Sequence, residues 1–241
     1  MTTPSLPTLM LLPGLNCDAA VWAPQVAALK NQANCVVPAW GLRDSLTAMA
    51  EQALAEAPTE RFALAGHSMG GRVALEVMRL APRRVTHLAL LDTGTHPLAA
   101  GEAGEKEKAG RMALLKIARE QGMRAMAQEW AKGMVHPDRI GSPLFNEVLD
   151  MFDRGSATQY AAQINALLNR LDATPLLAKI QCPTLVLTGR EDAWSGPAQH
   201  EAMAAAIKGA QLVIVEHSGH MTTMEQPEAV NRAFTAWISR T

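Results

Sequence analysis

The stretch RFALAGHSMGGRVALEVMRLA, residues 61–81, decides how the chain is expected to fold. Residues 61–65 form a short apolar run typical of a buried strand, and residues 69–81 carry apolar side chains at helical spacing. Between them, GHSMG at 66–70 fits the pattern G-x-S-x-G. A serine between a strand and a helix lies on a tight turn, so its neighbours two residues away must be small, as both glycines are. The stretch therefore predicts that Ser68 exposes its hydroxyl as a candidate nucleophile at the end of a strand.

Two other interpretations of this turn compete with a nucleophile. A phosphate-binding loop shares the glycine spacing of Gly66 and Gly71, but it needs Lys and then Ser or Thr where Arg72 and Val73 stand. A purely structural turn, by contrast, needs no catalytic partners elsewhere in the chain. The partner residues therefore decide between a structural turn and a nucleophile.

Short apolar runs alternate with amphipathic segments in both the first and the last part of the chain. The expected strands cover residues 8–12, 34–38, 61–65, 85–91, 184–188 and 212–215. The expected helices of these parts cover residues 19–31, 46–57, 69–81, 197–207 and 227–239. Strands that alternate with helices predict an α/β fold, with a mostly parallel sheet and helices on both faces.

The middle of the chain, residues 93–174, contains no convincing strand. Its expected helices cover residues 104–121, 123–134 and 156–170. We therefore expect a core formed by residues 1–92 and 175–241, with 93–174 inserted as a helical cap. The cap is expected over the carboxyl edge of the sheet, because ligands bind at that edge in open α/β folds.

The candidate base is His220, because a serine hydroxyl is a weak nucleophile until a base takes its proton. His220 follows the expected strand 212–215, in a loop at the same sheet edge as Ser68, and Gly219 frees the backbone beside it. His217 is the alternative, although it lies at the mouth of the strand, where a structural role is expected. His67 adjoins the serine, but its side chain should point away from the turn and pack.

The candidate acid is Asp192, which would hold the histidine in the correct tautomer and stabilise its protonated form. It follows the expected strand 184–188, one strand–helix unit before the histidine. Its neighbour Glu191 lies less deep in the loop. The alternative for both residues is that they are surface charges without a catalytic role. Asp92, at the end of the strand 85–91, is a second candidate for the acid.

The negative charge that develops on a carbonyl oxygen during acyl transfer needs fixed donors. One expected donor is the backbone N–H of Met69, the residue after the candidate nucleophile. The second is the N–H of Leu15, in the loop after the first strand, where Gly14 permits a sharp bend. Asn16 either adds a side-chain donor or caps the turn, and the turn role is the more common for this residue type.

Several large side chains are candidates for an apolar substrate pocket, with core packing as the alternative for each. Together with Asn16, these candidates are Trp40, Trp130, Met134, Trp194 and Met221.

Composition excludes several classes of function. The chain has 241 residues, 48% of them hydrophobic, which suits one domain with a large core. Its net charge is -1 without a block of like charge, so neither a nucleic-acid nor a membrane partner is expected. Its three cysteines are widely spaced, which argues against disulfides and zinc, and no metal or cofactor is expected. Residues 1–7 show no signal-peptide pattern and no apolar stretch is of bilayer length, so a cytoplasmic location is expected.

Five stretches together resemble the α/β-hydrolase superfamily across most of the chain. They are LMLLPGLNCDAAVW, FALAGHSMGGRVALEVM, PRRVTHLALLDT, CPTLVLTGREDAW and VEHSGHMTTMEQPE. The resemblance implies a nucleophile elbow at Ser68, a catalytic triad of Ser68, Asp192 and His220, and an oxyanion hole formed by Leu15 and Met69. The chain departs from many relatives at Pro13, where they have histidine, and at 38–45, where they have D-x-x-G-x-G-x-S. Both departures reshape the rim of the pocket rather than remove a catalytic atom.

The expected activity is that of a carboxylesterase-like serine hydrolase, which cleaves a small-molecule carboxylic ester through an acyl-enzyme. The same residues also suit thioester cleavage, carbon–carbon bond hydrolysis or the methyl ester of an acyl-carrier protein. For an acidic carrier, the basic residues of the expected cap are Arg111, Arg119, Arg124 and Arg139, with a solvated face as the alternative. A ligand receptor with little turnover is the alternative from a different class.

Overall fold

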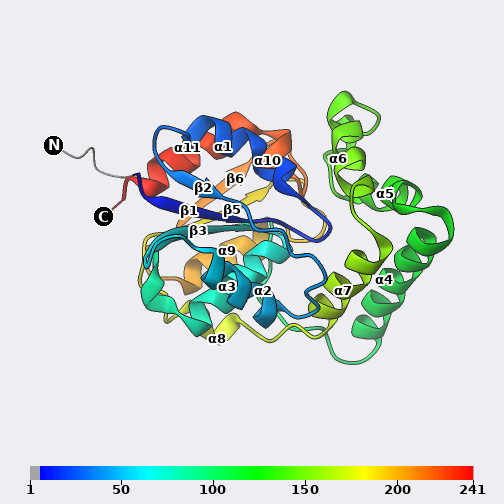
Figure 1. Ribbon diagram of the computed structural model, residues 1–241, viewed down its shortest axis with the longest axis horizontal. Helices are drawn as coiled ribbons and strands as arrows, with labels where there is room; N and C mark the ends of the chain where they lie inside the picture. The colour runs from blue at the N-terminus through cyan, green and yellow to red at the C-terminus, as the bar shows by residue number, and fades with distance from the viewer. Residues whose placement is uncertain (1–5, 241) are drawn as a thin grey trace.

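The computed structural model describes residues 6–240, and a six-stranded sheet runs through the middle of the molecule (Figure 1). The strands lie in the order β2-β1-β3-β4-β5-β6, and all of their pairings are parallel. Their bounds are β1 Thr8–Leu12, β2 Asn34–Val36, β3 Phe62–His67, β4 Val85–Leu91, β5 Thr184–Gly189 and β6 Gln211–Val215. The predicted α/β fold with a parallel sheet is therefore confirmed.

Two strands end two residues away from their expected ends. β2 stops at Val36, two residues before Pro38, and proline has no N–H to donate to a ladder. β3 continues to His67 instead of stopping at residue 65, because Gly66 and His67 stay in register with the last residues of β4. The strand therefore leads directly into the turn at Ser68.

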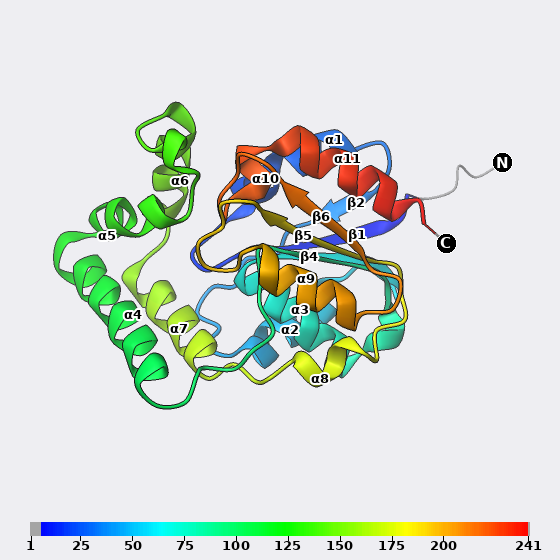
Figure 2. The ribbon, with the colours of Figure 1, turned by 180° about the vertical axis from the view of Figure 1, so that it is seen from behind.

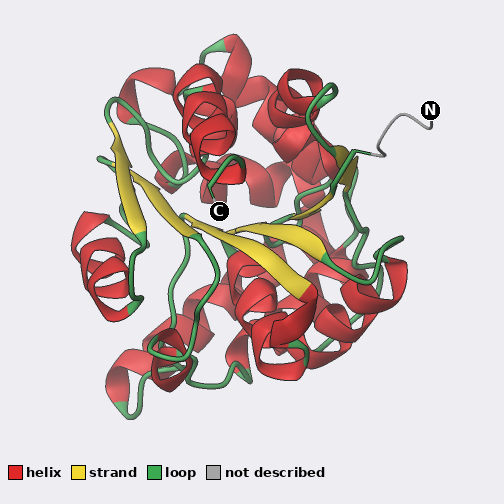
Figure 3. Ribbon diagram, turned by 90° about the vertical axis from the view of Figure 1, so that its left-hand side faces the viewer, coloured by secondary structure: helices red, strands yellow, loops and turns green. Residues whose placement is uncertain are grey.

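Helices cover both faces of the sheet, so that the molecule has three layers (Figures 1 and 3). One face carries α1 (Ala23–Leu29), α10 (Thr222–Glu225) and α11 (Pro227–Ile238). The other carries α2 (Leu46–Glu56), α3 (Met69–Leu80), α8 (Thr174–Leu177) and α9 (Pro197–Ala206). Alternate residues of a strand point to opposite faces. In β1, Leu9 and Leu11 accordingly pack with Trp22, while Met10 and Leu12 pack with Met49.

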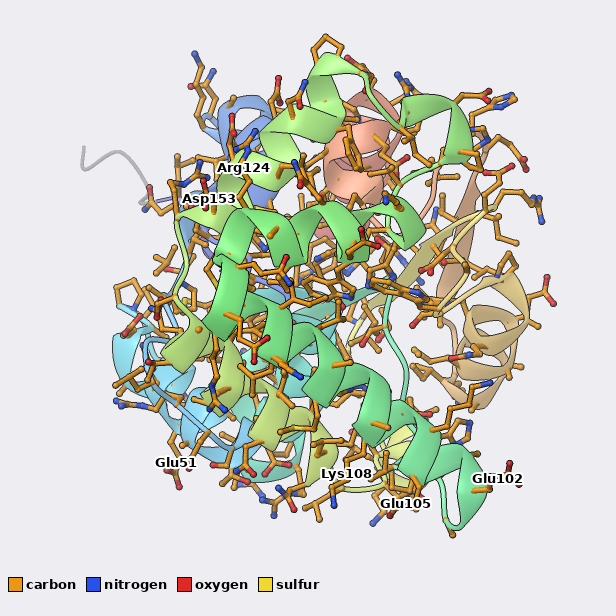
Figure 4. All side chains as sticks on the ribbon, turned by 90° about the vertical axis from the view of Figure 1, so that its right-hand side faces the viewer. Glu51, Glu102, Glu105, Lys108, Arg124 and Asp153 are labelled. Atoms are coloured by element: carbon orange, nitrogen blue, oxygen red, sulfur yellow. The ribbon has the colours of Figure 1, made fainter. Side chains whose placement is uncertain are left out.

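Four helices lie together beyond the carboxyl ends of the strands, as Figure 2 shows. They are α4 (Glu102–Gln121), α5 (Met123–Trp130), α6 (Pro143–Asp153) and α7 (Ala157–Leu168). Contacts between α4 and α5, α5 and α6, and α4 and α7 join them into one layer. On the outer side, Arg124 of α5 pairs with Asp150 and Asp153 of α6 (Figure 4). The division of the chain into a core and a cap at residues 93 and 174 stays a prediction.

Helix α6 is missing from the sequence-based expectation, although its signals are present. Ser142 caps the helix, since its side chain accepts a hydrogen bond from the N–H of Phe145, and Pro143 occupies the first turn. The apolar side chains of Phe145, Val148 and Phe152 follow at helical spacing and are buried.

No helix within residues 6–240 is both long enough and apolar enough to cross a bilayer. The expectation about a signal peptide concerns residues 1–7, most of which lie outside the described residues.

Candidate active site

Ser68 connects β3 to α3. Its backbone has φ 54° and ψ −118°, a conformation that residues other than glycine rarely adopt. Close packing explains both neighbouring glycines. A Cβ atom at Gly66 would overlap the carbonyl oxygen of Gly70, and one at Gly70 would overlap the carbonyl oxygen of Leu12 in β1. The N–H of Ser68 donates to the carbonyl oxygen of Leu91 at 2.9 Å. The turn is therefore fixed by the strands on both sides of β3.

The structure brings Ser68, His220 and Asp192 together in a hydrogen-bonded row. Nε2 of His220 lies 2.8 Å from Oγ of Ser68, and Nδ1 of His220 lies 2.8 Å from Oδ2 of Asp192. The carboxylate only accepts hydrogen bonds, so Nδ1 carries the proton and Nε2 is left to accept one from the serine hydroxyl. Asp192 follows β5 and His220 follows β6, so three parallel strands deliver the three side chains to one edge of the sheet.

Asp192 is held ionised. Burial would raise the pKa of its carboxyl, but the charge and hydrogen bond of His220 and the N–H groups of Ser195 and Trp194 outweigh burial. Both N–H groups donate to Oδ1 at 2.9 Å. The pKa of Asp192 is therefore held well below its usual range, and the full negative charge lies beside the imidazole.

The loop that carries His220 is clamped from two sides. The N–H of His220 donates to the carbonyl oxygen of Met134 at 2.6 Å, and Nε2 of His67 donates to the carbonyl oxygen of His220 at 2.7 Å. A Cβ atom at Gly219 would lie 2.7 Å from the carbonyl carbon of Val135, so this position has room only for glycine. His67 is thus buried, as expected, and also holds the loop of His220 in place.

The competing candidates for base and acid are not hydrogen-bonded to Ser68 or His220. His217 is exposed and stacks edge-on against His136. Glu191 accepts the N–H of Ser218 at 3.0 Å. Asp92 is fully buried, where it accepts the N–H of Gly189 and the hydroxyl of Thr222 rather than a nitrogen of His220. Burial, followed by the charge of Asp192, raises the pKa of Asp92 well above its usual range, so its charged form is disfavoured there.

The two expected oxyanion donors line the same cavity as Ser68. A Cβ atom at Gly14 would lie 3.2 Å from Cβ of Ser68, which shows how closely the loop after β1 passes the serine. Within residues 6–240, the backbone N–H groups of Leu15 and Met69 have no acceptor in the protein. Asn16 anchors this loop instead of lining the cavity, because its backbone N–H donates to Gln163 and its side chain donates to the carbonyl oxygen of Phe152.

A cavity of about 660 Å³ opens beside Ser68 and His220, bounded on one side by α4 and α7. Two of the expected pocket residues line it: Trp130 and Trp194 stack at 5.7 Å between ring centroids, and Trp194 also lies against the ring of His220. The other four candidates, Asn16, Trp40, Met134 and Met221, are buried and do not line the cavity.

Sequence reasoning missed most of the residues that form this cavity. Its apolar wall includes Leu114, Tyr160 and Leu167, and its charged wall includes Arg72, Lys106, Glu107, Arg111 and Arg170. Of these eight residues, only two are singled out in the sequence analysis. Arg72 appears there because it does not fit a phosphate-binding loop, and Arg111 appears as a basic residue of the expected cap. Among the four arginines considered for an acidic carrier, Arg111 reaches the cavity, while Arg124 is paired on the outer face.

The chain is similar to known proteins over most of its length. Residues 9–233 match the profile of a family described as "Alpha/beta hydrolase family". A relative from Acinetobacter baylyi, named (E)-2-((N-methylformamido)methylene)succinate hydrolase, is 27% identical and covers 97% of this chain and 90% of its own. A 3-oxoadipate enol-lactonase from the same organism is 31% identical over 73% of this chain and 62% of its own. The structure of a thermophilic esterase from Thermogutta terrifontis, solved with malate bound, has a TM-score of 0.85 and 28% sequence identity. The match covers 98% of this chain and 90% of the esterase. The names of these relatives all describe hydrolytic enzymes.

His200 lies behind the site and is fully buried. Its Nε2 accepts the N–H of Thr93 at 3.2 Å, and its Nδ1 donates to the carbonyl oxygen of Gly196 at 3.2 Å. A proton on Nε2 would face the N–H of Thr93 directly. Burial lowers the pKa of His200 to about 4, against the opposing effects of the Gly196 carbonyl and Asp192. The hydroxyl of Thr93 in turn donates to the carbonyl oxygen of Ser68.

We therefore expect acid to destabilise the protein partly through His200. The unfolded chain takes up a proton as the pH falls below about 6.5, whereas the folded state resists it down to its lowered pKa. Stability is thus lost between these two values, by up to about 3 kcal/mol from this residue. Urea unfolding from pH 7 to pH 4.5 should show a shallower pH dependence for His200→Gln than for the wild type. Equal slopes for the two proteins would contradict this role of His200.

Proposed function

The chain belongs to the α/β-hydrolase family, and we propose that it is a serine hydrolase that cleaves a carboxylic ester through an acyl-enzyme intermediate. The observation that carries the proposal is the row of Ser68, His220 and Asp192, with 2.8 Å at each step. A serine, a base within hydrogen-bond reach and a third group that orients the base form the arrangement that activates a hydroxyl nucleophile.

In the proposed reaction, Oγ of Ser68 attacks the ester carbonyl carbon while Nε2 of His220 takes its proton. The protonated imidazole is stabilised by the ionised Asp192, and the carbonyl oxygen becomes an oxyanion that accepts the N–H groups of Leu15 and Met69. His220 then returns the proton to the departing alcohol, leaving the acyl group on Ser68. Water, deprotonated by the same histidine, attacks the acyl-enzyme and releases the acid and the free serine. None of these steps requires a metal or a cofactor.

Two of the three relatives described above have names that support an ester as the bond that is cleaved. An esterase acts on carboxylic esters, and an enol-lactonase acts on a cyclic ester. Ester, lactone and thioester substrates all present a carbonyl carbon to the serine and develop the same oxyanion. Turnover of matched esters and thioesters, with identification of both products, distinguishes these substrates from one another.

Replacing the nucleophile gives the first test of this proposal. Ser68→Ala should lower the turnover of p-nitrophenyl butyrate by about four to six orders of magnitude, because the attacking atom is lost. The change removes one small hydroxyl, so the circular dichroism spectrum and the urea midpoint should stay close to those of the wild type. A purified Ser68→Ala protein that keeps a tenth of the wild-type turnover would refute the serine mechanism.

The two buried aspartates give a matched second test. Asp192→Asn removes the charge that orients His220 and should lower kcat by roughly 10⁴. Asp92→Asn should have a much smaller effect, since Asp92 is not hydrogen-bonded to His220 and an amide can keep its bonds to Gly189 and Thr222. Steady-state kinetics on the same ester measures both variants. The reverse order of effects would assign the acid to Asp92.

A further inference from the structure

Three arginines from three separate elements meet at the cavity beside Ser68. Arg72 belongs to α3, Arg111 belongs to α4, and Arg170 follows α7. Two of them share one carboxylate: Arg170 donates to both oxygens of Glu107 at 2.8 and 2.9 Å, and Nε of Arg111 donates to Glu107 at 2.9 Å. The outer face of α4 is different, because Glu102, Glu105 and Lys108 lie at the molecular surface (Figure 4).

Arg72 has no carboxylate partner within residues 6–240. Its one hydrogen bond to the protein runs from Nη1 to the carbonyl oxygen of His96, at 2.8 Å. A Cβ atom at Gly94 would lie 2.9 Å from Nη2 of Arg72, so the glycine leaves room for the guanidinium. A guanidinium has five donors, and most of those of Arg72 are left without a partner in the protein.

Burial and the neighbouring arginines both make the positive charge of Arg72 less favourable. Burial, and then the like charges of Arg170 and Arg111, lower its pKa to about 9, while Glu107 opposes this change. The group still carries its charge at neutral pH. The cavity lining holds three guanidinium groups and Lys106 against two carboxyl groups, Glu107 and Asp92. Burial raises the pKa of Asp92, which disfavours its charge. A partly buried charge without a partner costs free energy. A bound anion that pairs with Arg72 would remove this cost and so account for the excess of positive charge.

We propose that Arg72, together with Arg111 and Arg170, forms a subsite for a carboxylate group carried by the substrate. The inference rests on the proposed function and specifies its substrate class as monoanionic esters, such as half-esters of dicarboxylic acids. The two free N–H directions of a guanidinium fork match the two oxygens of a carboxylate. Glu107 fixes the other two arginines, which leaves Arg72 as the open fork.

The position of Arg72 suits this task. It follows the nucleophile by four residues, which is about 6 Å along a helix axis, so both groups face one small substrate. Leu114, Tyr160 and Leu167 line the same cavity as Ser68 and Arg72, and this largely apolar wall suits a short carbon chain. The carboxylate would then position the ester carbonyl against Ser68 and its N–H donors.

The test uses two esters that differ only in charge, the p-nitrophenyl half-ester of adipic acid and its methyl-capped diester. The wild type should prefer the anionic ester at least tenfold in kcat/KM, because a charge-assisted hydrogen bond to a desolvated arginine forms with only one of them. Arg72→Gln should reduce this preference at least tenfold, mainly through KM, and Arg72→Lys should restore part of it. Arg124→Gln, on the outer face, should leave the preference unchanged.

A binding measurement that needs no turnover tests the carboxylate subsite separately from the proposed hydrolase activity. Calorimetry on the Ser68→Ala protein should detect binding of monomethyl adipate, weaker binding of dimethyl adipate, and loss of the difference in the double variant Ser68→Ala/Arg72→Gln. Failure to hydrolyse either p-nitrophenyl ester would refute the proposed function, whereas the binding comparison would still decide the subsite. Equal affinity for the two adipates, or tighter binding of a phosphate monoester than of the half-ester, would overturn the carboxylate subsite.

Discussion

The site depends on the close approach of the turn at Ser68 to the neighbouring strand β1. Gly70 lies against the carbonyl group of Leu12 so tightly that no other residue fits, and Gly66 lies as tightly against Gly70. This packing holds Ser68 at a positive φ that the chain would otherwise avoid. Because β1, β3, β5 and β6 are parallel, the loop of Leu15, the turn of Ser68 and the loops of Asp192 and His220 all emerge at one edge. A strained turn and the parallel order of the sheet thus account for the geometry of the whole row.

Buried ionisable groups near the row are held in different charge states. Asp192 is ionised beside His220, while burial and the charge of Asp192 raise the pKa of Asp92 well above its usual range. Burial also keeps His67 neutral, because its pKa is lowered to about 3, and lowers the pKa of His200 to about 4. Environments that push two nearby carboxyl groups apart in pKa are typical of acid–base sites. Here they leave one full negative charge directly behind the imidazole.

The three residues that the structure brings into one row could be predicted from local sequence patterns. Ser68, Asp192 and His220 each follow a short apolar run, and the ends of parallel strands meet at one edge of a sheet. The residues that could not be predicted depend on how α4–α7 pack against that edge. Trp40 and Met221 are also large and apolar, like Trp194, yet they pack into the core clusters on the two sides of the sheet. Arg72 and Arg170 resemble surface charges in the sequence, and only the fold brings them to the same cavity as Ser68.

The central claim is that His220 and Asp192 make the hydroxyl of Ser68 an activated nucleophile. Labelling with a neutral fluorophosphonate measures this property directly, because the reagent modifies activated serines without needing a particular substrate. We expect intact-mass analysis to show one phosphonyl group per chain, peptide mapping to assign it to Ser68, and ester turnover to fall in proportion to labelling. Undiminished turnover under saturating reagent, with the Ser68 peptide unmodified, would contradict the account.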